Sequence, residues 1–301
     1  MRILITGGTG LIGRALCPVL LEAGHQVTVL SRHPASVLGK CGSGVTPLSS
    51  LSDWHEGVAF DAVINLAGEP IVDAHWSAAR KKRLWDSRVT LTQQLVERIA
   101  ACTHRPSVLL SGSAIGYYGD RGDVPLDEST GASTDFAAQL CAAWENAAEQ
   151  ARLLGLRVCL LRTGLVLSAR GGVLNRMLLP FKLGLGARLG DGRQWMSWIH
   201  IDDYIAAVLK LLGATEAGGA FNMTAPCPVT NREFTARLAA VLHRPAWFAA
   251  PAWLLVLALG PRKILLLGGQ NVLPVKLLGL GFHFKHPVLD NALQALLSGR
   301  P

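Results

Sequence analysis

The sequence predicts an α/β protein with a doubly wound parallel sheet and a small C-terminal lobe. Short apolar runs rich in β-branched residues alternate with longer segments in which apolar residues recur at helical spacing. This alternation is typical of a parallel sheet whose two faces are covered by helices. The chain has 301 residues, of which 50% are hydrophobic, so it can bury a large core.

A glycine-rich turn follows the first predicted strand, residues 2–6. Residues 3–13 have the sequence I-L-I-T-G-G-T-G-L-I-G, and apolar residues then recur at helical spacing. Gly7 and Gly10 would let the backbone approach a ligand, Gly13 would let the helix pack closely on the strand, and the helix N-terminus would offer N–H groups to a pyrophosphate. Strand, turn and helix together predict a Rossmann-type dinucleotide site. The glycines fit two registers of the motif, which leaves its subtype open, and a glycine turn without a ligand is the alternative.

The end of the second predicted strand, residues 26–30, indicates which dinucleotide binds. Enzymes that use NAD usually carry Asp or Glu here, which binds the ribose 2′-hydroxyl. This chain has Ser31 and Arg32 instead. A guanidinium can bind a 2′-phosphate through two hydrogen bonds and a hydroxyl can donate to it, whereas a carboxylate would repel it. The sequence therefore predicts NADP(H) rather than NAD(H), with an exposed loop arginine as the alternative.

Strands and helices continue to alternate along the chain. A weak strand near Val45 precedes an apolar strand at residues 60–68, whose last residues, Asn-Leu-Ala-Gly, are small enough for a second close approach to the cofactor. The next predicted elements are a helix from about 77 to 101, a strand at 107–113, a helix at 136–154 and a buried strand at 156–167.

Two later helices have predicted caps. Residues 198–203 open a helix with Asp202 or Asp203 as its N-cap. Thr230 and Glu233, three residues apart, predict a capping box at the start of the next helix.

We expect two structural parts: a Rossmann domain at residues 1–243, whose segments after about residue 170 also build the substrate lobe, and a small, mainly helical domain at residues 244–301. The longest apolar helical candidate, residues 252–259, is far shorter than the roughly 20 residues that cross a bilayer. The first strand begins at residue 2, so we expect no secretory signal. The six cysteines are scattered without a C-x-x-C pair, which is typical of reduced thiols in a cytoplasmic protein.

The formal net charge is +8, and the chain from Arg244 onward carries six Lys or Arg against one Asp. These charges are dispersed among apolar residues, so the sequence disfavours nucleic-acid binding. Such a tail could lie on an anionic membrane surface. Packing against the substrate lobe, or against a second subunit of a homodimer, is the favoured alternative. The nine histidines show no metal-ligand spacing, so no metal site is predicted.

Taken together, these residues resemble the extended and atypical short-chain dehydrogenases/reductases, most closely the epimerase-family group of NADP-dependent, nucleotide-sugar-epimerase-like proteins with a small extra C-terminal domain. The resemblance covers essentially the whole chain. It rests, as a set, on the glycine turn, Ser31-Arg32, Asn65 to Ile71, Trp76, Ser87-Arg88, Gly112-Ser113-Ala114, Tyr117-Tyr118-Gly119, Arg162-Thr163-Gly164, Trp198 to Asp202, Gly268-Gly269-Gln270 and Gly281-Phe282.

The resemblance implies an oxidoreductase or epimerase-like enzyme that acts on a small molecule. It implies that Val166 lies near the nicotinamide end of the cofactor. The full set of implied cofactor contacts is Thr6, Gly7, Gly10, Leu11, Ile12, Gly13, Ser31, Arg32, Leu66, Ala67, Gly68, Arg88 and Val166. For Arg88 the alternative is a solvated charge on a basic helix face.

The catalytic residues of short-chain dehydrogenases/reductases are incomplete in this chain. These enzymes usually pair Ser or Thr at the end of the fifth strand with Tyr-x-x-x-Lys on the next helix, where the tyrosine transfers the proton and the lysine lowers its pKa. Ser113 has the first position. Alignment of Glu145 with the usual downstream acid puts Ala137 and Cys141 at the Tyr and Lys positions. This helix contains neither residue type, so the usual acid is missing.

Two interpretations stay open. In the first, Tyr117 or Tyr118 replaces the missing acid, since a nearby cation can lower the pKa of a phenol. For both tyrosines, packing of the substrate loop is the favoured alternative, and the Cys141 thiol is a weaker candidate. In the second, the protein is a sensor or scaffold that binds NADP(H) without turnover, because some members of the wider group are linked to cell division. We favour the enzyme.

The substrate cleft is expected outside the carboxyl ends of the strands, facing the nicotinamide. Arg193, beside an aromatic residue, could hold an anionic substrate group such as a phosphate, although a loop arginine is equally compatible with the sequence. Glu69 could instead pair locally. The candidate lining residues are Glu69, Ser113, Tyr117, Tyr118, Arg193, Gln194 and Trp195.

Overall fold

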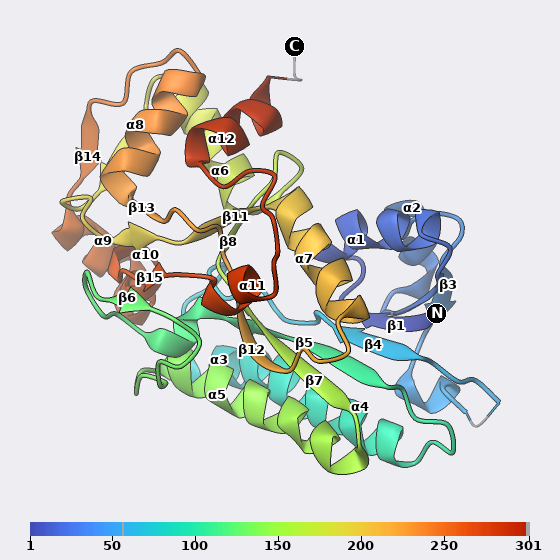
Figure 1. The fold of residues 1–301 in the computed structure, drawn as a ribbon. Coiled ribbons are helices and arrows are strands. Elements are labelled where there is room, and N and C mark those ends of the chain that lie inside the picture. The colour runs from blue at the N-terminus through green and yellow to red at the C-terminus, as the bar shows by residue number, and fades with distance from the viewer. Residues whose placement is uncertain (56, 299–301) are drawn as a thin grey trace.

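The computed structural model describes residues 1–55 and 57–298, which fold around a seven-stranded parallel sheet (Figure 1). Its strands are β1 (Arg2–Thr6), β2 (Gln26–Leu30), β3 (Thr46–Leu48), β4 (Ala62–Asn65), β5 (Val108–Ala114), β7 (Arg157–Thr163) and β12 (Gly219–Met223). The order is β12-β7-β5-β4-β1-β2-β3, and every adjacent pair is parallel. The predicted doubly wound sheet is confirmed. The strand order reverses between β1 and β4, the point outside which open α/β sheets bind ligands.

Helices cover both faces of this sheet, so alternate side chains of one strand enter different cores (Figure 1). Ile3 and Ile5 of β1 pack with α1 (Leu11–Glu22) and α7 (Ile201–Gly213). Leu4 packs with α4 (Leu91–Ala100) and the end of α5 (Phe136–Glu149). Strands buried on both faces are mainly apolar, as their sequences predict, and their buried polar residues lie toward their carboxyl ends. The longer helices are α1 (Leu11–Glu22), α3 (Ala78–Trp85), α4 (Leu91–Ala100), α5 (Phe136–Glu149), α6 (Gly172–Lys182), α7 (Ile201–Gly213), α8 (Asn231–Val241), α9 (Ala252–Leu259) and α12 (Leu289–Leu297).

Two predicted elements are divided in the structure. The expected strand at 156–167 ends at Thr163, and β8 (Leu165–Leu167) leaves the sheet to pair with β11 (Trp198–His200). The division falls at Gly164, where a Cβ would lie 2.4 Å from the Ser197 carbonyl oxygen. The helix expected from 77 to 101 is divided by a π-helical turn at Asp86–Thr90, which separates α3 from α4.

A second layer lies beside the sheet and contains segments from the last third of the chain. Helices α6, α8 and α12 share one apolar core. The segment after residue 243 pairs with upstream strands, so the chain's C-terminal part is joined to both layers. The remaining elements are α2 (Val37–Cys41), β6 (Pro125–Leu126) paired with β15 (Asn271–Val272), β9 (Ala187–Leu189) paired with β14 (Phe248–Ala250), β10 (Trp195–Met196) paired with β13 (Val229–Thr230), α10 (Ile264–Leu267) and α11 (Val275–Gly279).

The two predicted caps have different outcomes. Thr230 and Glu233 form the expected capping box of α8. The N-cap of α7 is His200 rather than an aspartate, because His200 Nδ1 accepts the Asp202 N–H at 3.0 Å. Asp203 instead turns inward, where its carboxylate accepts the backbone N–H groups of the segment before α12.

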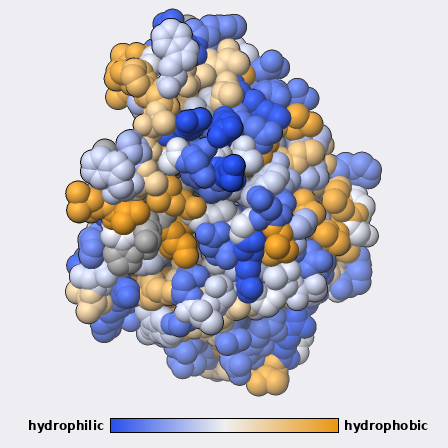
Figure 2. Space-filling view, turned by 90° about the vertical axis from the view of Figure 1, so that its left-hand side faces the viewer, coloured by the Kyte–Doolittle hydropathy of each residue, from blue (hydrophilic) through white to orange (hydrophobic). Residues whose placement is uncertain are grey.

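Large apolar side chains lie exposed around β14 and α9. Trp247 is 88% exposed, Trp253 69% and Leu257 78%. Figure 2 views the molecule from this side and shows apolar patches between hydrophilic ones. Within the described ranges, no helix combines the length and the apolar character needed to cross a membrane. All six cysteines are free thiols, and only Cys227 is exposed.

Candidate functional site

The glycine turn after β1 is shaped by backbone contacts. Gly7 has φ +70°, and a Cβ there would lie 2.6 Å from the backbone of Leu66. A Cβ on Gly13 would lie 2.4 Å from the backbone of Gly8. Gly10 is the N-cap of α1 and has no side chain to occupy the first N–H groups of the helix. The turn therefore presents unpaired donors at the positive end of the helix dipole, which suits an anion.

A cavity of about 710 Å³ opens beyond this turn, along the carboxyl ends of β1, β2 and β4. The predicted cofactor residues in its lining are Thr6, Gly7, Gly10, Ser31, Arg32, Leu66, Ala67 and Gly68. Two other segments contribute further polar lining residues that were not predicted as cofactor contacts: Ser49, Ser50, Arg83, Asp86, Ser87, Thr90 and Gln94. The predicted residues Leu11, Ile12, Gly13, Arg88 and Val166 lie outside this lining.

Buried hydrogen bonds hold the floor of the cavity. The Thr6 hydroxyl donates to Asn65 at 2.6 Å and accepts the backbone N–H of Ala67 at 3.2 Å. Asn65 in turn donates to Thr92 at 2.8 Å and to Ser111 at 3.1 Å. These bonds tie three parallel strands to α4, so the backbone after β4 is fixed before any ligand arrives.

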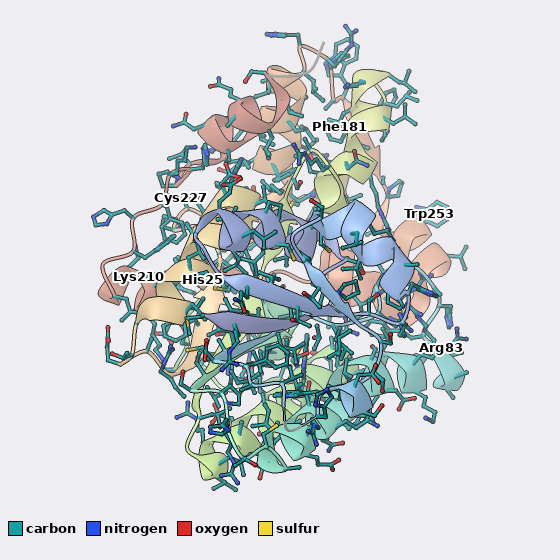
Figure 3. All side chains as sticks on the ribbon, turned by 90° about the vertical axis from the view of Figure 1, so that its right-hand side faces the viewer. His25, Arg83, Phe181, Lys210, Cys227 and Trp253 are labelled. Atoms are coloured by element: carbon teal, nitrogen blue, oxygen red, sulfur yellow. The ribbon has the colours of Figure 1, made fainter. Side chains whose placement is uncertain are left out.

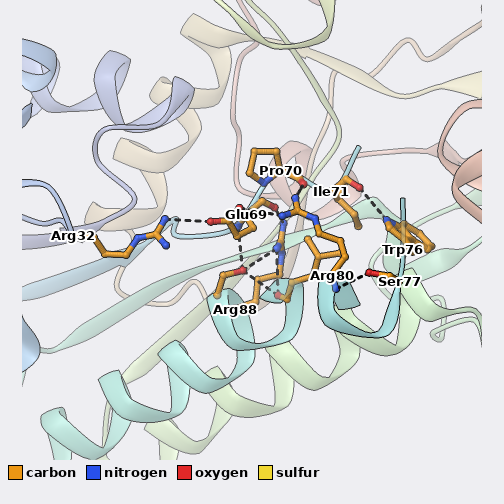
Figure 4. A network of polar contacts seen from close by, with 10 residues as sticks. Arg32, Glu69, Pro70, Ile71, Trp76, Ser77, Arg80 and Arg88 are labelled. Carbon is orange, nitrogen blue, oxygen red and sulfur yellow. Dashed lines mark hydrogen bonds and ion pairs between the residues drawn. The ribbon is translucent and has the colours of Figure 1, made fainter. Parts of the chain in front are cut away.

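The guanidinium of Arg32 reaches from the end of β2 to the loop after β4 (Figure 4). It is 85% exposed and donates to the Glu69 carboxylate at 3.2 Å. Arg80 binds the other oxygen of that carboxylate at 3.3 Å. Burial would raise the pKa of Glu69, but hydrogen bonds from Arg32 and Arg80 lower it below its usual value. Because the Arg32 guanidinium already binds the Glu69 carboxylate at the mouth of the cavity, it can also bind the anionic group of a ligand there.

Arg88 is not a solvated charge. It comes from the π-helical turn, donates to the Glu69 carbonyl at 2.8 Å and lies against Gly68, where a Cβ would meet its guanidinium at 3.1 Å. Its guanidinium also stacks over Trp144, with 5.4 Å to the ring centroid. Burial lowers the pKa of Arg88. The side chain supports the loop after β4, and its direct contact with a cofactor stays a prediction.

Ser113 lies at the end of β5, as expected, but its hydroxyl is already engaged. It donates to Glu145 Oε1 at 2.6 Å. Arg162 binds both oxygens of Glu145, at 2.8 and 2.9 Å. The side chains of Arg162 and Glu145 are 5% and 7% exposed. Although burial opposes its charge, Arg162 has a raised pKa because of the Glu145 carboxylate.

The two candidate phenols differ in their surroundings, within a short 3-10 turn at Ile115–Tyr118. Tyr118 is fully buried, accepts from Arg162 at 2.9 Å and donates to Asn222 at 2.7 Å. Burial raises the pKa of Tyr118 to about 12. Its position does not support the predicted substrate contact. Tyr117 is part-exposed, and its ring lies 3.6 Å from the Arg162 guanidinium carbon.

The positions of the missing Tyr-x-x-x-Lys pair are packing positions. Ala137 and Cys141 are buried in α5. A Cβ on Gly116 would lie 3.7 Å from Ala137 and 3.9 Å from the Cys141 sulfur, so small side chains here let the 3-10 turn approach α5. Burial raises the pKa of the Cys141 thiol to about 12, which makes it a poor acid and nucleophile at neutral pH.

The remaining substrate candidates lie on the segment between β9 and β11. Arg193 is 84% exposed, with 3.9 Å between its Nε and a carboxylate oxygen of Asp191. The Trp195 indole donates to Asp123 at 2.8 Å. The side-chain amide of Gln194 donates to the Leu189 carbonyl at 3.1 Å. Of these, Arg193 has the greatest freedom to meet a substrate.

Comparisons with known proteins agree with this geometry. The sequence matches the family described as NAD dependent epimerase/dehydratase over residues 3–224, and a domain of unknown function, DUF1731, over residues 250–296. An epimerase family protein of Mycobacterium bovis is 41% identical over 291 residues, which are 96% of this chain and 95% of that protein. A chloroplastic epimerase family protein of Arabidopsis thaliana, a homologue of SDR39U1, is 37% identical over 99% of this chain and 87% of its own length.

A solved structure is similar over the full length. The crystal structure of human epimerase family protein SDR39U1 with NADPH has a TM-score of 0.90 at 34% identity, and the match covers 100% of each chain. The predicted resemblance, including the extra C-terminal region, is confirmed. On the match over residues 3–224 and the identity to its relatives, this chain belongs to the NAD dependent epimerase/dehydratase family.

Proposed function

We propose that the protein binds NADP(H) in the cavity beyond the glycine turn and acts as an oxidoreductase or epimerase-like enzyme on a small molecule, an anionic compound or nucleotide sugar. One observation carries the proposal. The acidic residue that NAD-binding enzymes usually carry after β2, and that would repel a 2′-phosphate, is absent. Arg32 stands there instead, and its guanidinium binds the Glu69 carboxylate at the cavity mouth. The human relative whose structure contains NADPH supports the choice of coenzyme.

The chain's own residues fit the parts of this coenzyme. The N–H groups at the start of α1 would hold the pyrophosphate, and Gly7 and Gly10 leave room for it. Ser31 and Arg32 would hold the 2′-phosphate. The bound coenzyme would supply or accept a hydride. Ser113 and Tyr117 then define where a substrate carbonyl or hydroxyl would lie, at the carboxyl end of β5.

Tyr117 is the proposed proton donor. It is the part-exposed phenol beside the end of β5, and its ring lies 3.6 Å from the Arg162 guanidinium carbon. Ser113 is proposed to orient the substrate oxygen, which requires its hydroxyl to turn away from Glu145. Arg162 and Glu145 position both residues and touch no substrate in this arrangement.

A second candidate function is NADP(H) binding without turnover, as a sensor or scaffold. The buried Ser113–Glu145–Arg162 network favours it, because the hydroxyl that usually orients the substrate is bound within the protein. This function shares the coenzyme site with the first and differs only in the chemistry.

Coenzyme titration tests the shared part. NADPH should bind wild-type protein more tightly than NADH, and Arg32→Ala should weaken NADPH binding about tenfold while NADH changes little. Titration calorimetry with both coenzymes measures this, with Arg193→Ala as a control that removes an exposed arginine elsewhere. Equal affinities of the wild type for the two coenzymes would contradict the proposal.

Turnover assays separate the two functions. NADPH oxidation is followed with a panel of carbonyl compounds, and nucleotide sugars are analysed for a changed sugar configuration, because an epimerase regenerates its coenzyme. The enzyme predicts turnover with at least one substrate and a fall of about a hundredfold in kcat for Tyr117→Phe. Tight NADPH binding without oxidation or epimerisation across the panel supports the sensor.

A further inference from the structure

A second cavity, of about 960 Å³, shares no lining residue with the first. It lies between α1, α2, α7 and the C-terminal segment around residues 285–296. Figure 3 shows this face of the molecule, with α1 and α2 in front. The coenzyme proposal makes no use of it.

Two buried histidines contribute to this lining. His200 is 3% exposed and His286 is 8% exposed. Their ring centroids are 4.0 Å apart with an interplanar angle of 35°. Within residues 1–55 and 57–298, neither Nε2 atom has a hydrogen-bond partner. Buried polar atoms are nearly always paired, so unpaired ring nitrogens on two adjacent buried rings point to a group that comes from outside the chain.

The helix cap of α7 determines which nitrogen of His200 carries the proton. Its Nδ1 accepts the Asp202 N–H at 3.0 Å, so in the neutral ring the proton is on Nε2. Burial, and then the neighbouring His286, lower the pKa of His200 to about 4, so the ring is neutral at pH 7. Its Nε2–H is therefore a buried donor that lacks an acceptor.

A metal ion fits this arrangement poorly. One ligand atom each of His200, Asp202 and His286 lie within 4.8 Å of one another. However, a metal needs an unprotonated ring nitrogen, and His200 has Nδ1 occupied by the helix cap and Nε2 protonated. Binding a cation would therefore break the cap of α7.

The charge around the cavity favours an anion. Four exposed cationic residues line it, and Asp202 is its single acidic lining residue. Asp203, the other acid at the start of α7, is bound by the backbone N–H groups of Lys285 and His286. The four cationic residues come from α1, α2, the loop after β8 and the segment before α12: Arg14, Lys40, Arg170 and Lys285.

We propose that this second cavity is a phosphate-binding site, in which the Nε2–H of His200 and the cationic side chains at the rim bind the phosphate group of a small molecule. Imidazole N–H groups and guanidinium groups are the donors that phosphate oxygens accept. Free phosphate and a phosphomonoester present the same group. The volume of about 960 Å³ leaves room for the organic part of the latter.

The test uses the full chain saturated with NADPH, so that the glycine turn is occupied, with isotope-labelled histidines observed by nuclear magnetic resonance. Orthophosphate and ribose 5-phosphate are titrated against sodium chloride of equal ionic strength. We expect saturable shifts of the His200 and His286 imidazole signals and none at His25, which lies outside the lining. Tighter binding of ribose 5-phosphate would identify an organic ligand, and equal binding would identify free phosphate.

Variants then locate the site. Arg170→Ala should weaken phosphate binding about fivefold, whereas Lys210→Ala, in the last turn of α7, should leave it unchanged (Figure 3). His286→Asn supplies the signal assignment and should also weaken binding. Absence of saturable shifts with both phosphates, equal effects of Arg170→Ala and Lys210→Ala, or shifts caused by Zn²⁺ at lower concentration than by phosphate would each overturn the proposal.

Discussion

Two parts of one sheet edge are built in opposite ways. At the carboxyl ends of β1, β2 and β4, an open cavity begins at the glycine turn, with an exposed Arg32 at its mouth. At the ends of β5 and β7, Ser113, Glu145 and Arg162 form a closed side-chain network that is almost entirely buried. The first part is arranged to receive a ligand, whereas the second satisfies its own polar groups.

The two parts also differ in what their geometry depends on. The geometry of the glycine turn depends on close backbone contacts at Gly7 and Gly13. The usual Tyr-x-x-x-Lys chemistry depends on two side chains of α5, and in this chain Ala137 and Cys141 pack there instead. In this chain the two α5 positions of the Tyr-x-x-x-Lys pair are therefore packing positions.

The largest expected effect comes from breaking the buried ion pair. Arg162→Met leaves the Glu145 carboxylate buried without its partner, which should lower the free energy of unfolding by about 3–5 kcal/mol. Urea denaturation followed by circular dichroism measures it. The double variant Glu145→Leu with Arg162→Met should recover most of the loss. A loss below about 1 kcal/mol in the single variant would show that the network is open to water.

Gly13→Ala tests the close backbone contacts of the glycine turn. Its Cβ would lie 2.4 Å from the backbone of Gly8, so we expect a loss of about 3 kcal/mol and weaker NADPH binding. Gly39→Ala is the matched control, because it is also a helical glycine and a Cβ there meets no atom within 4 Å. Similar behaviour of the two variants would contradict the close approach of α1 to the turn.

A fall in pH should first affect a residue outside both parts, the neutral imidazole of His200 at the N-terminus of α7. Burial lowers the pKa of His200 from 6.5 to about 4, so below pH 6.5 the unfolded chain binds a proton that the folded chain excludes. Stability should therefore fall by roughly 2 kcal/mol as the pH drops from 6.5 to 4. In His200→Asn, which keeps a side-chain acceptor for the helix cap, this pH dependence of unfolding should flatten. An unchanged dependence of the unfolding free energy on pH in this variant would show that other groups cause the loss of stability.

The smallest effect concerns the exposed pair at the cavity mouth. Glu69 competes with a 2′-phosphate for Arg32, and exposed ion pairs contribute under about 1 kcal/mol. Glu69→Gln should therefore raise NADPH affinity about two- to threefold and hardly change stability. Asp191→Asn, which removes another exposed partner of an arginine, should change neither. A fall in NADPH affinity for Glu69→Gln would mean that the carboxylate itself holds the coenzyme.

Much of the open part could be predicted from local sequence. The parallel sheet, the glycine turn and the polar end of β2 follow from runs of about ten residues. The N-cap of α7 could not be predicted in this way, because His200 takes the place of the expected aspartate. Asp203 instead accepts the backbone N–H of Lys285, 82 positions away. Contacts of that separation are set by which helices pack together.

The sequence by itself determined the fold class and the dinucleotide turn, because strand periodicity and glycine backbone freedom are local properties of the chain. Only the tertiary structure decided what Ser113 and Tyr118 do. Their partners lie 32 and 104 positions away and reach them through the order of the sheet. Burial then fixes their protonation and their hydrogen bonds, which no pattern of neighbouring residues specifies.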